Sequence, residues 1–177
     1  MKRQIRSCVF ETNSSSMHSL VIKKSGGYYT YEEACEYIYI HDGVWNIRNE
    51  DHLTFGRSPF GYLNTFESKV RYAIASLCCH RKDAEKLFKK IESIVCEIIP
   101  DCHKIELPTK WHNDDPCYGW VDDDILSPFL KNKNISVKEF LTNKKYVVIV
   151  DGDEYCIWED LKDSGLVNID EIEEEFR

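Results

Sequence analysis

FESKVRYAIASLCCHRKDAEKLFKKIESIVCEIIP, residues 66–100, is the most strongly periodic stretch of the chain. Apolar residues recur in it every three or four positions, which is the spacing of one face of an α-helix. These residues are Val70, Ala73, Ile74, Leu77 and Cys78 in the first half, and Leu87, Ile91, Ile94, Val95 and Ile98 in the second. The break at 80–82, with Asp83 placed to cap a second helix and Pro100 to end it, predicts a helical hairpin.

Shorter patterns on both sides of this hairpin predict strands and two more helices. Residues 4–10 and 19–23 predict a strand pair, residues 103–107 a strand, and residues 145–159 a β-hairpin that turns at Asp151-Gly152. The pairs Thr30/Glu33 and Ser136/Glu139 match capping boxes and predict short helices. Residues 41–61 are expected to be loop with short extended pieces, and no period persists over residues 108–128.

The order of these elements predicts an α+β fold, in which a helical hairpin packs on an antiparallel sheet. A length of 177 residues suits a single compact domain, so we expect one domain over residues 1–177. Its last part, residues 168–177, is strongly acidic and is expected to fray as a tail.

The charge of the chain is uneven along its length. Its formal net charge is −8. Residues 1–24 carry five bases against Glu11 alone, residues 111–130 carry five acids and no Lys or Arg, and residues 151–177 carry eleven acids against two bases. Such a chain repels nucleic acid over most of its surface and attracts basic partners, so we expect a protein partner with a basic surface and no direct nucleic-acid binding.

Composition predicts a globular protein of the cytoplasm. Hydrophobic residues make up 42% of the chain, which is enough for a core. No apolar segment of signal-peptide length follows the charged N-terminus, and no apolar run approaches the ~20 residues of a membrane span. In a reducing compartment, the eight cysteines are expected to be small buried hydrophobes.

The segment FETNSSSMHS, residues 10–19, is the first candidate site, and three interpretations of it stay open. It is a turn whose side chains bond their own backbone, or a loop that holds a phosphate or another anion, or a serine nucleophile with a histidine base. The G-x-S-x-G motif of hydrolases is absent, which counts against the nucleophile. The ligand-binding candidates are Arg6, Glu11, Asn13, Ser14, Ser15, Ser16 and His18.

The segment WHNDDPCYGWVDDD, residues 111–124, is the second candidate site. It is a solvated acidic loop anchored by its tryptophans, a site for a hard cation such as Mg²⁺ or Mn²⁺, or a surface that binds a basic protein. The metal candidates are Asp122, Asp123 and Asp124, and the partner-binding candidates are Trp111, Asp114, Asp115 and Trp120.

Other groups of possible metal ligands, and the known catalytic motifs, give weaker support for a site. The series Cys96, Cys102, His103, His112 and Cys117 lacks the two close ligand pairs of a zinc site. Asp151, Asp153 and Glu154 are better explained by a hairpin turn than by a metal site. No Walker A loop, dinucleotide-binding glycine motif, H-E-x-x-H or kinase set occurs, so we expect no cofactor and leave open whether the chain is an enzyme.

The stretch CVFETNSSSMHSL resembles the N-terminal signature V-F-E-T-N-S-S-S-x-H-S of a family of small proteins without an assigned activity, encoded by gut Firmicutes and their phages. TFGRSPF, ESKVRYAIAS and YGWVDDD are similar to later parts of that family, whose members more often have Asp-His where this chain has Asp122-Asp123. The resemblance implies a phage or mobile-element setting in a bacterial host cell. It brings no catalytic residue.

Two functions from different classes follow. In the first, the chain is an accessory protein that binds and inhibits or modulates a host protein through its acidic surfaces, as an anti-CRISPR-like inhibitor would. In the second, it is a small metal-assisted enzyme or a binder of a phosphorylated ligand, which uses the Ser/His loop and the Asp-rich loop together with Mg²⁺ or Mn²⁺.

Overall fold

The computed structural model describes residues 17–23, 26–55, 61–110, 115–121 and 124–151. The predicted strand at 4–10, the second strand of the hairpin at 145–159 and the acidic tail at 168–177 lie outside these residues. The described part has an α+β fold, with helices packed on an antiparallel sheet as predicted.

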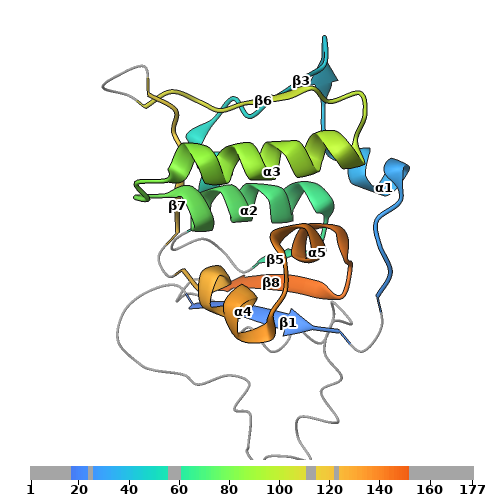
Figure 1. Cartoon of the computed structure of the whole chain (residues 1–177), viewed down its shortest axis with the longest axis vertical. Helices are drawn as coiled ribbons and strands as arrows, with labels where there is room; N and C mark the ends of the chain where they lie inside the picture. The colour runs from blue at the N-terminus through green and yellow to red at the C-terminus, as the bar shows by residue number, and fades with distance from the viewer. Residues whose placement is uncertain (1–16, 24–25, 56–60, 111–114, 122–123, 152–177) are drawn as a thin grey trace, which may run out of the picture.

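The predicted helical hairpin is present as α2 (Phe66–Cys78) and α3 (Ala84–Ile98), which lie side by side across the middle of the molecule (Figure 1). Thr65 and Ser68 cap α2 reciprocally. Asp83 stands before α3 as predicted, but its carboxylate accepts a hydrogen bond from Arg81 Nε instead of from the helix backbone. Almost all side chains of α2 are buried, whereas α3 buries one stripe.

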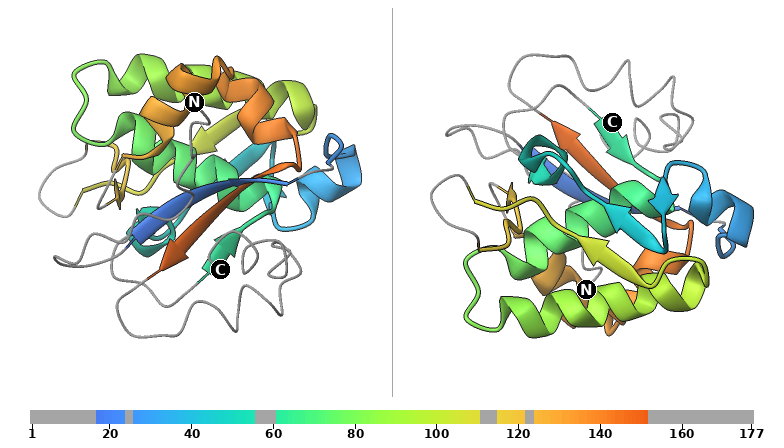
Figure 2. Two further views of the ribbon diagram at one scale, coloured as in Figure 1. Left: turned by 90° about the horizontal axis from the view of Figure 1, so that it is seen from below. Right: turned by 90° about the horizontal axis from the view of Figure 1, so that it is seen from above.

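A three-stranded antiparallel sheet in the order β1–β8–β5 lies on one side of the hairpin. Its strands are β1 (Met17–Ile22), β5 (Gly61–Leu63) and β8 (Tyr146–Asp151). In the register of β1 and β8, His18 is opposite Val150. The central strand β8 is buried from Tyr146 to Val150, which accounts for its unbroken apolar sequence. The helices lie on one face of these strands (Figure 2).

Shorter strands complete the described part. β2 (Ile40–His41) and β3 (Val44–Asn46) form a hairpin, and β6 (Lys104–Glu106) runs parallel to β3 on the far side of the helical hairpin (Figure 1). β4 (Thr54–Phe55), which follows the 3-10 helix η1 (Glu50–Leu53), runs parallel to β7 (Trp120–Val121). The antiparallel sheet was predicted, but the two parallel pairings were not.

Three short helices surround the hairpin. Capping residues Thr30 and Ser136 begin α1 (Tyr31–Cys35) and α5 (Val137–Thr142), as predicted. The third, α4 (Leu126–Lys133), was missed, because its start lies within residues 108–128 and Pro128 stands inside its first turn. Asn134 ends α4 in the left-handed conformation, with φ of 53°.

Gly119 lies directly before β7, where the backbone passes close to Leu53. Its φ is +77°, and a Cβ atom on it would lie 2.1 Å from the carbonyl oxygen of Leu53. Both the backbone conformation and the space therefore require glycine at this position.

We expect Gly119→Ala to lower the free energy of unfolding by about 1–3 kcal/mol or more, because it combines backbone strain with a clash against main chain. Gly27→Ala is the matched control, since the nearest atom to its added methyl would be Lys144 Cε at 3.9 Å. Urea unfolding followed by circular dichroism checks both variants. Equal stability of the two variants would contradict the role given to Gly119.

Candidate functional site

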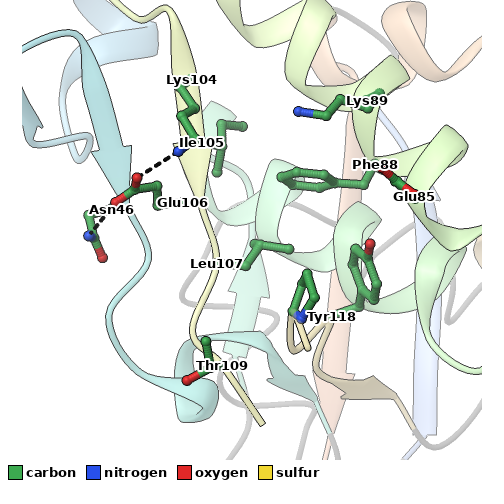
Figure 3. A pocket seen from close by; sticks show the side chains of 11 residues that line it. Asn46, Glu85, Phe88, Lys89, Lys104, Ile105, Glu106, Leu107, Thr109 and Tyr118 are labelled. Atoms are coloured by element: carbon green, nitrogen blue, oxygen red, sulfur yellow. Dashed lines mark hydrogen bonds and ion pairs between the residues drawn. The ribbon is translucent and has the colours of Figure 1, made fainter. Parts of the chain in front are cut away.

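A groove of about 530 Å³ lies between α3 and β6 (Figure 3). Phe88 from α3, Ile105 from β6, and Leu107 and Tyr118 from the adjoining segments form its apolar floor. The rings of Phe88 and Tyr118 meet edge to face, with their centroids 5.8 Å apart, and burial raises the pKa of the Tyr118 hydroxyl. The floor is therefore packed and uncharged.

The rim of this groove carries charges of both signs. Lys104 donates to Glu106 at 2.7 Å, and Asn46 donates to the same carboxylate at 3.2 Å (Figure 3). Lys89 and Glu85 lie on the opposite rim, on α3. Such a lining suits a partner segment with apolar side chains and a few polar ones more than it suits a highly charged ligand.

Glu92 joins the two walls of the groove. This residue of α3 is buried, and its carboxylate accepts hydrogen bonds from the backbone N–H of Ile105 at 3.0 Å and from Lys89 Nζ at 2.6 Å. Among the described residues, β6 is the last strand of the order β2–β3–β6, and Glu92 of α3 covers its outer edge at Ile105 by accepting from that N–H. Leu107, two residues further along that edge, makes no backbone hydrogen bond within the described residues.

Of the first candidate site, only His18 is described. Arg6, Glu11, Asn13, Ser14, Ser15 and Ser16 lie outside the described residues. His18 is buried on β1, where its Nδ1 lies 3.2 Å from the hydroxyl of Tyr72 on α2 and the two rings meet edge to face. The imidazole thus faces the helices and forms part of the core.

Of the second candidate site, Asp115, Trp120 and Asp124 are described, and Trp111, Asp114, Asp122 and Asp123 are not. Asp124 accepts hydrogen bonds from Ser76 Oγ at 2.7 Å and from the backbone N–H of Ser127 at 3.0 Å. It therefore ties the first turn of α4 to α2. Asp115 and Trp120 are exposed, and Trp120 lies on β7.

The structure brings His18 and Asp124 to the same helix. Their partners Tyr72 and Ser76 are four residues apart on α2, so the two contacts lie on adjacent turns, about 6 Å apart along the helix axis. The ends of both candidate segments therefore meet the same region of the core.

Lys69 is the most unusual side chain of α2, and sequence reasoning missed it. It is fully buried, and its Nζ donates to the backbone carbonyl of Asn143 at 2.9 Å. The rings of Tyr29 and Phe140 lie 5.2 and 5.1 Å from Nζ. Burial lowers the pKa of Lys69 to about 7, against a smaller opposing effect of Glu139.

Lys69, Tyr72 and Ser76 form one buried polar row on α2, at helical spacing. Lys69 binds the residue after α5, Tyr72 binds strand β1, and Ser76 binds the segment before α4. The sequence offers only a weak signal, because Lys69 lies beside Val70 and one turn before Ala73 in a helix that also contains Glu67 and Arg71. It could not show which residues the three side chains meet.

Metal ligands and reactive thiols are not evident in the described residues. No group of three or more His, Cys, Asp or Glu side chains able to hold a metal ion occurs among them. The six described cysteines are free, and burial raises the pKa of Cys78 to about 12. Burial likewise raises the pKa of Cys79, Cys96, Cys102 and Cys117, which keeps these thiols protonated.

No protein-family model matches the chain, and no curated protein or solved structure is significantly similar to it. Among the described helices, none is long and apolar enough to cross a membrane.

The buried Lys69 predicts a pH dependence of stability. Its pKa is about 7 in the folded protein and about 10.4 in the unfolded chain, so the unfolded state binds the extra proton between these values. Stability should therefore rise with pH in this range, by up to about 1.4 kcal/mol per pH unit for this group.

We expect the free energy of unfolding of the native protein, minus that of Lys69→Met, to increase between about pH 7 and pH 9. Urea unfolding with reductant present measures this difference, which cancels the titration of other groups. Lys90→Met, at an exposed position of α3, is the control, and its difference should stay constant. A pH-independent difference for Lys69→Met would contradict a depressed pKa.

Proposed function

We propose that this chain is a binding protein of a phage or another mobile element that docks onto a host protein and inhibits or modulates it in the cytoplasm of the host. The α3–β6 groove is the observation that supports binding most directly, because it combines an apolar floor with a backbone segment at Leu107 that makes no backbone hydrogen bond within the described residues. The phage setting rests on the resemblance of the FETNSSSMHS segment.

The chemistry of the groove suits an extended segment of the partner. Because Glu92 already binds the N–H of Ile105, an extended segment would obtain main-chain hydrogen bonds beyond that point, from Leu107 onward, while its alternate side chains reach the floor. Leu107 is placed to pair with such a strand, since its N–H is on the same edge as that of Ile105. Phe88, Leu107 and Tyr118 would then contact apolar side chains of the partner.

The described residues also make catalysis a weaker proposal than binding. The two buried groups that resemble catalytic candidates, His18 and Lys69, hold the core together through Tyr72 and Asn143. Asp124 is bound to Ser76 and to the start of α4.

Substitution of Thr109 tests the groove. Thr109 is exposed at its rim, and Thr109→Arg puts a long charged side chain there. Asn132→Arg is the matched control, because it adds the same side chain at an exposed position of α4. Native protein and both variants are used for affinity capture from a bacterial host lysate, and for selection from a random heptapeptide library.

We expect Thr109→Arg to lose the captured protein and to weaken selected peptides by on the order of tenfold, and Asn132→Arg to retain both. Leu107→Ser should weaken the same peptides, because it removes part of the apolar floor. If Thr109→Arg and the native protein bind peptides and host protein equally well, the groove is not the binding site.

A second candidate function is a metal-assisted enzyme or a binder of a phosphorylated ligand. It is favoured by one observation, that His18 and Asp124 contact adjacent turns of α2. It would place the phosphate and Mg²⁺ or Mn²⁺ near the ends of the two candidate segments.

Thermal unfolding with Mg²⁺ or Mn²⁺ and ADP tests this second function, because a ligand of the folded state raises the melting temperature. Under this function we expect an increase that needs metal and ADP together and that is lost in Asp124→Asn. No change in melting temperature at millimolar ligand would remove this candidate.

A further inference from the structure

The segment around α1 exposes four tyrosine rings close together in the chain. Of the seven large hydrophobic side chains that are exposed among the described residues, four belong to residues 28–39. They are Tyr28, Tyr31, Tyr37 and Tyr39, with exposed fractions of 61%, 44%, 59% and 73%. Exposed aromatic residues gathered in this way mark interaction surfaces.

Two of these rings are held in place although they are exposed. The hydroxyl of Tyr28 donates to Glu139 Oε2 at 2.9 Å, and the hydroxyl of Tyr31 donates to Asp101 Oδ2. These carboxylates come from α5 and from the residues after α3, so they connect the α1 segment to the rest of the fold. Rings held before binding lose less conformational entropy when a partner docks.

The same segment contains acidic residues and no lysine or arginine of its own, although Lys144 and Lys145 lie beside it. Residues 26–43 contain Glu32, Glu33, Glu36 and Asp42, and no Lys or Arg. Lys144 pairs with Glu33 at 2.8 Å, and Lys145 lies 3.7 Å from Glu139. Glu32, Glu36 and Asp42 are exposed, and Asp42 lies 3.2 Å from His41 Nδ1, so Glu32 and Glu36 carry most of the charge that attracts a cationic partner.

We propose that the tyrosine surface, formed by Tyr28, Tyr31, Tyr37 and Tyr39 with Glu32, Glu36 and Asp42, docks an arginine-rich segment of a partner protein. A guanidinium group stacks on the face of a tyrosine ring and pairs with a carboxylate in two hydrogen bonds. The excess of carboxylates on the surface disfavours nucleic acid as the occupant.

This surface is separate from the α3–β6 groove. α1 lies at the margin of the molecule beside the end of α3, in Figure 1 as in Figure 2, and Asp101 follows that end. The groove is lined by Glu85, Phe88 and Lys89, from the first part of α3. The inference rests on the proposed function only in that the protein acts by binding, and the two surfaces can be tested independently.

The test measures the affinity of the full chain for a labelled peptide in which arginine and glycine alternate, by fluorescence anisotropy at low and high salt. We expect the double variant Tyr37→Ala/Tyr39→Ala to weaken binding by about fivefold or more for each ring, and Tyr37→Phe/Tyr39→Phe to retain it, because a phenyl face still attracts a cation. Glu32→Gln/Glu36→Gln should weaken binding mainly at low salt.

One control variant decides between the outcomes. Trp120→Ala removes an exposed aromatic ring on β7, beside the Asp-rich segment, and should leave the affinity unchanged. Loss of binding in Trp120→Ala with no effect of Tyr37→Ala/Tyr39→Ala would overturn the proposal and assign the peptide to the Asp-rich segment. The proposal is also overturned if the native protein binds no peptide. In that case, a failure of Thr109→Arg to capture the host protein would still support the proposed function of the groove.

Discussion

Helix α2 imposes the main constraint on this structure, because it is buried on nearly its whole circumference and yet contains polar side chains. A buried polar group without a partner costs about 1–3 kcal/mol, so each one must find a partner on another element. Lys69, Tyr72 and Ser76 do so with Asn143, His18 and Asp124. These three contacts fix the end of α5, the strand β1 and the start of α4 around one helix.

The same constraint separates the core from the surfaces that are free to bind. His18 and Asp124 were candidates for ligand binding in the sequence. In the structure they are the hydrogen-bonding partners of Tyr72 and Ser76 on α2. Among the described residues, the two surfaces proposed for binding are the α3–β6 groove and the tyrosine surface, at opposite ends of α3. The groove has an apolar floor and the other surface is aromatic and acidic, so they would suit different parts of a protein partner.

The sequence predicted well what depends on neighbours in the chain. The periodicity of residues 66–100 and the capping residues Thr30 and Ser136 gave the hairpin and two short helices, because these signals act over three or four positions. It predicted less well what depends on distant contacts. The parallel pairings of β3 with β6 and β4 with β7 join short segments that carry no signal of their partner.

The candidate site was harder to predict for the same reason. His18 and Asp124 were selected for their residue types, but whether such a side chain binds a ligand or a core residue depends on what lies opposite. Lys69 was overlooked because a lysine in a helix is normally exposed, and only the packing of Tyr29 and Phe140 reveals otherwise. The α3–β6 groove needs four segments to form, and none of them suggests it alone.

The position of β8 at the centre of its sheet has a consequence for synthesis. On the ribosome, β1 is made before the hairpin and β8 after it, so β1 and β5 have no strand between them until the chain has passed residue 151. The α2–α3 hairpin is local in the chain, so its two helices can begin to form first, before the other elements bury α2. Until β8 emerges, β1 and β5 lack the strand that both of them pair with, and a chain cut short within α5 would keep those pairing edges exposed to water or to chaperones.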